Sequence, residues 1–243
     1  MSSHWYRKDG VTAYGASLKE AREMGYLPSV TTIDKVIANE GLEQWKIRQG
    51  ILAALTMPKD DSESDADYIA RILDDSRQQA KKAAKLGSVI HKLAERYISG
   101  KPLFFKGLRS DVWTLFEPVK EWINSANLKG EAEKVLIGDG FAGKADYTDW
   151  GIIADYKTTF MTADNVKKDG TIKKAKIYDS WGRQLAALQA TSRNHRDCVS
   201  VVISTNKDFP GVWCYYWSQL ELDKHFEVFR SALNIYRIQK GLS

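Results

Sequence analysis

The chain has 243 residues, of which 43% are hydrophobic and 11% aromatic, so it is long and apolar enough to bury a full core. No apolar run approaches the roughly 20 residues that span a bilayer, and residues 1–10 are too polar for a signal peptide. We therefore expect a cytoplasmic protein with no membrane partner. The net charge of +5 only mildly favours a polyanionic partner.

The N-terminal third of the chain has the periodicity of helices. Apolar residues recur at three- and four-residue intervals, with Thr31 or Thr32 as the expected N-cap of the first helix. The same pattern continues to Tyr97, and a further helix follows. The predicted helices are 30–39, 42–55, 66–97 and 110–126.

The period then changes to two, which predicts strands. A basic loop at 165–176 interrupts the series. The other predicted elements are strands 132–138, 141–148 and 152–158, helix 178–194, strands 198–205 and 211–218, and helix 222–239. This order predicts an α/β or α+β fold in which a mixed central sheet lies between helices. We expect one domain over 1–243, with a helical N-terminal region (1–80) and a core (81–243).

Two aspartates and a lysine lie close together on one predicted hairpin. If Trp150 and Gly151 form its two-residue loop, the register places Asp146 opposite Asp155, with Cβ atoms roughly 5 Å apart. Lys157 shares the face of Asp155, because side chains alternate along a strand. Two carboxylates at that separation repel each other, and Mg²⁺ or Mn²⁺ is the simplest remedy. The alternative is an ordinary exposed ion pair between Asp155 and Lys157.

A predicted helix places Gly87, His91 and Glu95 on one face. A lone helical histidine is more often a surface or core residue than a ligand. A glycine in the middle of a helix costs about 1 kcal/mol relative to alanine, so Gly87 indicates that another group approaches closely.

Four short motifs in sequence carry a resemblance to a known family. They are Gly-x-x-x-His at 87–91, Gly-x-x-Asp at 143–146, Asp-x-Lys at 155–157 and the helical segment QLAAL at 184–188. Together they resemble the PD-(D/E)XK nuclease superfamily, in particular its RecB-like exonuclease branch, over roughly residues 85–217. Residues 27–46 also resemble the N-terminal region of small single-strand exonucleases related to the mitochondrial genome maintenance exonuclease and its phage and bacterial relatives.

The resemblance implies a restriction-endonuclease-like core and a set of metal ligands. His91, Asp146, Asp155 and the main-chain carbonyl of Tyr156 would hold one or two Mg²⁺ or Mn²⁺ ions, and Lys157 would be the catalytic lysine. An acidic residue on the first strand would complete the site, with Glu133 preferred and Glu131 left open. No iron–sulfur cluster is expected, because Cys198 and Cys214 are the only cysteines.

The resemblance also assigns residues to the substrate. Gln184 matches the glutamine of the family's Gln-x-x-x-Tyr motif, but Leu188 occupies the tyrosine position, a loss for which Tyr178 or Trp181 would compensate. Lysines of the basic loop are expected to contact phosphates, although a solvated, mobile hairpin is the alternative. These lysines are Lys167, Lys168, Lys173, Lys174 and Lys176. Trp181 could stack on a base or belong to the core.

The expected activity is that of a Mg²⁺- or Mn²⁺-dependent deoxyribonuclease, an exonuclease acting on DNA ends or single strands. Its setting would be recombination, repair or phage DNA metabolism, in the host cytoplasm if a phage encodes it, with a helicase or recombinase as a further partner. Two alternatives remain open: a restriction-type endonuclease of the same superfamily, and a DNA-binding module without catalysis.

Overall fold

The computed structural model describes residues 4–37, 40–103, 110–192 and 196–242. By its internal contacts the chain divides into two compact units, one made of Met1–Ile37 with Ile90–Ser243 and the other of Ala38–Val89. The N-terminal segment, which periodicity alone groups with a helical region, thus belongs to the larger unit. The division of the chain at residue 80 stays a prediction.

The smaller unit contains two helices joined by a loop. α3 (Glu40–Thr56) and α4 (Asp65–Ile98) match the predicted helices, and α4 continues beyond this unit into the larger one. Tyr68 donates a hydrogen bond of 3.1 Å to the carbonyl of Ala54, and Arg71 forms an ion pair of 2.7 Å with Glu63. These contacts hold the loop end of the helical pair together.

A five-stranded mixed sheet forms the centre of the larger unit, with strand order β4-β5-β6-β7-β8. β6 and β7 are parallel, whereas the other neighbouring pairs are antiparallel. The strands are β4 (Glu131–Gly138), β5 (Phe141–Thr148), β6 (Ile152–Thr159), β7 (Asp197–Ser204) and β8 (Val212–Trp217). The predicted mixed α/β architecture is therefore confirmed.

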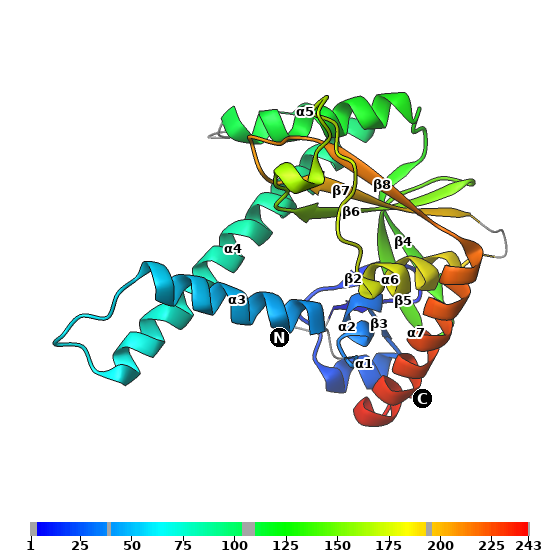
Figure 1. Ribbon diagram of the computed structural model, residues 1–243. Coiled ribbons are helices and arrows are strands. Elements are labelled where there is room, and N and C mark those ends of the chain that lie inside the picture. Colours follow the sequence, from blue (N-terminus) through cyan, green and yellow to red (C-terminus); the bar gives the residue numbers. More distant parts are fainter. Residues whose placement is uncertain (1–3, 38–39, 104–109, 193–195, 243) are drawn as a thin grey trace. The chain divides into compact units, whose positions relative to one another are not determined.

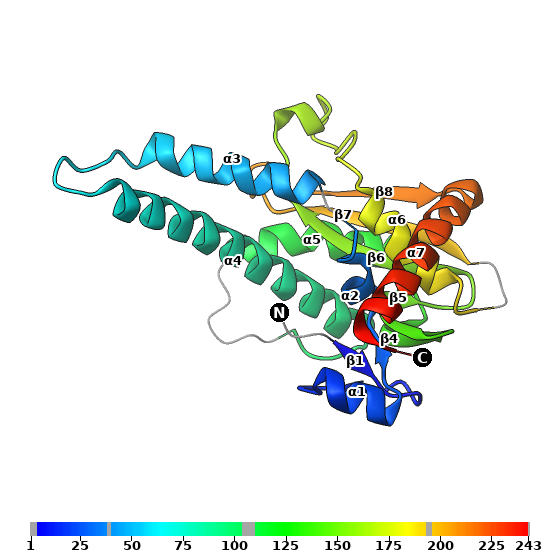
Figure 2. The same ribbon diagram turned by 90° about the horizontal axis from the view of Figure 1, so that it is seen from below.

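Helices lie on both faces of this sheet, as Figures 1 and 2 show. α5 (Ser110–Ser125) covers one face, where Trp122 contacts the ring of Tyr156 edge-on. α6 (Asp179–Gln189) and α7 (Gln219–Lys240) cover the other face. α6 lies between β6 and β7 in the chain, because parallel neighbours need a crossover connection. A short 3₁₀ helix, η1 (Ala163–Asn165), begins that connection.

The N-terminal segment forms elements that periodicity does not predict. β1 (Trp5–Tyr6), β2 (Thr12–Ala13) and β3 (Leu27–Pro28) make a small sheet, and α1 (Leu18–Met24) lies between β2 and β3. Strands of two residues are too short to show alternation. The N-cap of α2 (Val30–Asp34) is Ser29, so the assignment of Thr31 or Thr32 is wrong. The predicted continuation to residue 39 ends outside the described residues.

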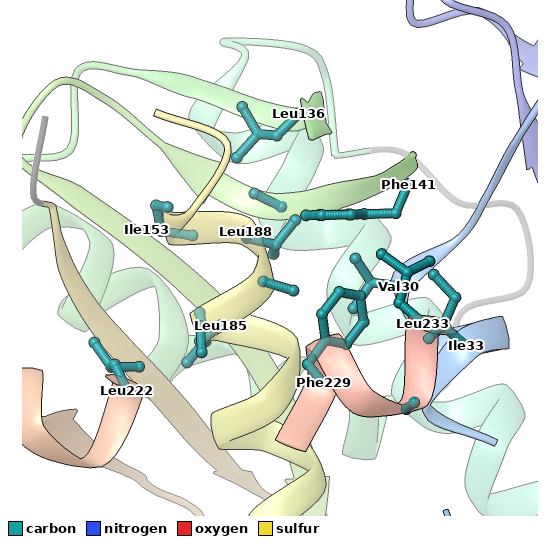
Figure 3. Packing of buried hydrophobic residues seen from close by; sticks show 14 of the residues in the cluster. Val30, Ile33, Leu136, Phe141, Ile153, Leu185, Leu188, Leu222, Phe229 and Leu233 are labelled. Carbon is teal, nitrogen blue, oxygen red and sulfur yellow. The ribbon is translucent and has the colours of Figure 1, made fainter. Parts of the chain in front are cut away.

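The core of the larger unit lies where α2, α6 and α7 meet the sheet. Figure 3 shows side chains from all of these elements in contact, among them Ile33, Ile153, Leu185 and Phe229. A Cβ at Gly143 would lie 2.7 Å from Leu188 Cδ2 and 2.8 Å from Val30 Cγ2, so only glycine allows α2 and α6 to approach β5 this closely. This packing fixes α6 over the strands that carry the aspartates.

Among the helices of the described residues, none combines the length and the apolar character that a bilayer-spanning segment needs.

Candidate active site

The predicted hairpin has the expected register. Tyr147 pairs with Ala154 and Thr148 with Ile153, and the Asp149 N–H donates to the Ile152 carbonyl at 3.1 Å. The loop is therefore Trp150–Gly151, and Asp146 lies opposite Asp155. Within the described chain, regular pairing of β5 and β6 ends at Tyr147 and Ala154.

The strands separate at the aspartates because a side chain replaces a backbone partner. The Tyr156 N–H donates to Asp146 Oδ2 at 2.6 Å rather than to a carbonyl of β5. The Asp146 carboxylate thus lies between the two strands, and the predicted pair of aspartates is brought to one place in the sheet.

Asp155, Lys157 and Gln184 form a closed triangle of polar contacts. Lys157 Nζ lies 2.6 Å from Asp155 Oδ2 and donates to Gln184 Oε1 at 2.9 Å. Gln184 Nε2 in turn donates to Asp155 Oδ1 at 2.9 Å. α6 therefore places Gln184 beside Asp155 and Lys157 of β6. The alternative of an exposed ion pair is wrong, because Asp155 is only 2% exposed.

Burial sets the protonation of Asp155. Removal from water raises the pKa of its carboxyl from 3.8 to about 6, and the Asp146 charge adds to the rise, although Lys157 and His91 oppose it. Its buried Oδ2 accepts no well-directed hydrogen bond despite the nearby ammonium. This oxygen is an acceptor for which a cation would be favourable.

His91 joins the cluster from α4. Its Nδ1 lies 3.3 Å from Asp146 Oδ1, and its ring meets that of Tyr156 edge-on at 5.7 Å. Burial disfavours the imidazolium, but the hydrogen bond and charge of Asp146 outweigh it, so the pKa of His91 is raised. The pKa of Asp146 is correspondingly lowered, because His91 outweighs the effect of burial on that carboxyl.

Glu133 is the acidic residue of β4 nearest the cluster. The pairs Ala132–Tyr147 and Lys134–Ala145 bracket it, which places it opposite Asp146. Its φ of 58° turns it out of regular strand geometry, and its carboxylate forms an ion pair with Lys144. Glu131 lies opposite Thr148 and pairs instead with Lys134. The register therefore favours Glu133 over Glu131.

The side chains of the cluster suit a hard divalent cation chemically, although in this structure they contact one another. In the described part of the chain, no three or more His, Cys, Asp or Glu side chains are arranged as a metal-binding group. The His91 and Tyr156 N–H contacts occupy the Asp146 oxygens, and Gln184 and Lys157 face those of Asp155. The two carboxylates and the imidazole are nevertheless ligands that Mg²⁺ or Mn²⁺ accepts.

Trp181, Tyr178 and Lys176 form a series of neighbouring contacts that begins at Lys157. Its ammonium lies 5.9 Å from the centroid of the Trp181 ring, which is 5.0 Å from that of Tyr178. Lys176 Nζ lies 4.9 Å above Tyr178. Trp181 is half-buried and packs against the core, so the structure gives it contacts with both the core and the site.

Two apolar side chains of the basic loop pack against the larger unit. Val166 bridges to Ile172, and Ile172 and Ala175 are buried against Met161 and Val202. The side chains of Lys167, Lys168, Lys173, Lys174 and Lys176 are all exposed on this segment. The loop therefore presents its charges to solvent, although its contact with a substrate stays a prediction.

A cavity of about 270 Å³ adjoins Gln184. The N-terminal segment contributes the phenols of Tyr6 and Tyr14 and the hydroxyls of Ser29 and Thr31, while Lys144 lines it from β5. Leu188, which lies four residues after Gln184, is fully buried in its wall. The sequence reasoning missed these lining residues, although Lys144 lies inside the Gly-x-x-Asp motif and Ser29 and Thr31 inside the segment 27–46.

Comparison with known proteins identifies the fold. No model of a known protein family matches the sequence, and no curated protein does. The crystal structure of "Putative exonuclease" from Eubacterium rectale superposes with a TM-score of 0.54 at 14% identity, covering 96% of this chain and 88% of that one. An alkaline exonuclease from Laribacter hongkongensis gives a TM-score of 0.30 at 12% identity, covering 82% of this chain and 98% of that one. The likeness to the Eubacterium rectale structure shows a shared fold, in which a crossover helix joins the parallel strands of a mixed sheet.

Proposed function

We propose that this protein is a Mg²⁺- or Mn²⁺-dependent deoxyribonuclease that removes nucleotides from DNA ends or single strands. The observation that carries the proposal is the partly buried cluster in which Asp146 and Asp155 meet Lys157, Gln184 and His91. A structural ion pair would need neither a second carboxylate nor an imidazole beside it. The exonuclease named in the similar Eubacterium rectale structure agrees with this class of reaction.

His91, Asp146, Asp155 and the Tyr156 carbonyl would hold the metal, which supplies Lewis acidity and lowers the pKa of a bound water. The other roles belong to the chain itself. Lys157 is held by Asp155 and Gln184, so its ammonium is positioned before substrate binds and offsets negative charge that develops on the scissile phosphate. Gln184 fixes both partners through its two amide atoms.

The cavity beside Gln184 supports action on a strand end. Its volume of about 270 Å³ is near the lower limit of roughly 300 Å³ for ligand pockets, which suits one nucleotide and not a duplex. Tyr14, with 85% of its side chain exposed, offers a ring on which a base could stack. Recombination, repair or phage DNA metabolism is the setting that we propose, with or without a helicase or recombinase partner.

The decisive experiment uses end-labelled linear and circular DNA, single- and double-stranded, with Mg²⁺, Mn²⁺ or chelator. We expect short products from linear DNA and none from circles, and Asp155→Asn and Lys157→Met should each reduce cleavage at least about 100-fold. The matched control is Lys120→Met, a half-buried lysine on α5 that pairs with Glu117. Undiminished cleavage by both variants would contradict the proposal, and discrete fragments from circular duplex would favour a restriction-type endonuclease.

A further inference from the structure

A second cavity, of about 280 Å³, lies at the turn between β4 and β5. Lys8, Arg22 and Arg237 line it together with a single carboxylate, that of Asp139. These residues come from the N-terminal segment, from α1, from the last turn of α7 and from the β4–β5 turn. None of them belongs to the aspartate cluster or to the cavity beside Gln184.

The three cations of this cavity, Lys8, Arg22 and Arg237, form no ion pairs among the described residues, and Arg22 has only a hydrogen bond of 2.7 Å from its Nε to the carbonyl of Lys240. The contrast is Lys144 in the first cavity, which Glu133 neutralises. Three cations therefore face one carboxylate.

The negative C-terminal ends of two helices offset part of this positive charge. α1 ends at Gly25 and α7 at Gly241, and both lie in the cavity wall. The C-terminus of a helix is equivalent to about half a negative charge. The two helix ends and Asp139 together leave about one positive charge, which favours an anion.

Close backbone approach places the two guanidinium groups. Gly140 has φ +78°, and a Cβ there would overlap Arg237 Nη2, so the guanidinium lies directly against the β4–β5 turn. A Cβ at Gly241 would lie 3.2 Å from Arg22 Nη2. The Arg237 guanidinium thus packs against the β4–β5 turn, and the exposed Arg22 is held by its hydrogen bond to the Lys240 carbonyl. Planar guanidinium donors match phosphate oxygens.

We propose that Lys8, Arg22 and Arg237 form a second phosphate-binding site. Gly140 lies six residues before Asp146, which along a strand is about 20 Å. The phosphate bound here is therefore not the one that is cleaved. It belongs either to the DNA strand at a distance from the cut or to a free phosphate anion, and only the strand case rests on the proposed function.

The test uses the full chain without divalent metal, so that no DNA is cleaved. The variant is Lys8→Gln with Arg22→Gln, both at exposed positions, and the matched control is Arg230→Gln, an exposed arginine of α7 that already pairs with Glu227. One arm measures the rise in melting temperature with inorganic phosphate at constant ionic strength. The other measures the affinity for a labelled single-stranded oligonucleotide by fluorescence anisotropy over a range of salt concentrations.

If the site holds a strand phosphate, the double variant binds the oligonucleotide several-fold more weakly, and the slope of log affinity against log salt falls by about 0.7 for each phosphate that the variant no longer neutralises. If it holds a free anion, the response to inorganic phosphate disappears and oligonucleotide affinity is unchanged. A variant that matches both wild type and Arg230→Gln in both arms overturns the site. Neither arm requires cleavage. If the protein binds inorganic phosphate through these residues but cleaves no DNA, the phosphate site stands and only the nuclease proposal is contradicted.

Discussion

At the scale of single residues, burial makes the ionised form of Asp155 unfavourable in the folded protein. Its pKa of about 6 lies above the ordinary 3.8, so the folded protein binds the proton more tightly than the unfolded chain does. Without metal, ionisation of this carboxyl therefore destabilises the fold. The effect is absent below pH 3.8, develops between pH 3.8 and about 6 and is complete above that pH. A divalent cation would remove this cost, because it favours the ionised form.

We accordingly expect stabilisation by Mg²⁺ to depend on pH. Above about pH 6 saturating Mg²⁺ should raise the melting temperature of the wild type, whereas at lower pH the proton on Asp155 competes and the rise should disappear. Thermal unfolding with Mg²⁺ and with chelator, from acid to mildly alkaline pH, measures this. Asp155→Asn should show a small rise at every pH; an equal, pH-independent rise in both proteins would speak against metal binding by Asp155.

At the scale of elements, α6 is held against α2 by an ion pair directly beside the cluster. Arg183 Nε lies 2.5 Å from Asp34 Oδ1, and Arg183 Nη2 lies 3.4 Å from Asp34 Oδ2. The side chains are 9% and 17% exposed, so water does little to screen them. Because Arg183 precedes Gln184, this contact fixes the part of α6 that supports Lys157.

Removing one partner should therefore be costly. Asp34→Ala leaves the guanidinium buried without a counter-charge, and we expect a decrease of about 3 to 5 kcal/mol in the free energy of unfolding, measured with urea. The double replacement Asp34→Leu with Arg183→Met should recover most of that decrease. The control Glu227→Ala, in the exposed pair with Arg230, should change stability by less than about 1 kcal/mol. Equal decreases for Asp34→Ala and Glu227→Ala would mean that the Asp34–Arg183 ion pair contributes no more to stability than an exposed ion pair.

At the scale of the whole molecule, charge is concentrated locally although the net charge is only +5. The loop with Lys173 and Lys174 packs on the larger unit through Ile172 and Ala175, and its ammonium groups are exposed to solvent. Exposed cations release counterions from a nucleic acid when it binds, and this makes affinity depend on salt.

Replacing Lys173 and Lys174 with glutamine should weaken binding of single-stranded DNA without lowering stability, because both side chains are exposed. The slope of log affinity against log salt, measured by anisotropy without metal, should fall by about 0.7 for each phosphate that these lysines neutralise in the wild type. Lys19→Gln with Lys120→Gln is the matched control, since both lysines already have acidic partners. An unchanged slope would show that the loop does not contact DNA.

Long periodic segments and the hairpin could be predicted from the sequence because their signals are local. α4, α5, β5, β6 and α7 follow from periods of 3.6 and 2, and the dipeptide Trp150–Gly151 fixes the register of Asp146 and Asp155. The small N-terminal sheet could not be predicted, because strands of two residues depend on their partners rather than on their own pattern.

The residue types and their order along the chain were decided by the sequence alone: two aspartates and a lysine on one hairpin, with a histidine and a glutamine on helices before and after it. Tertiary structure decided which atoms meet. It turned Gln184 towards both Lys157 and Asp155, placed Glu133 rather than Glu131 beside Asp146, and brought Tyr14 and Lys144 to one cavity. The reason is physical: periodicity assigns a residue to a face of its own element, but contacts between elements depend on long-range packing, such as that of α2 and α6 against Gly143.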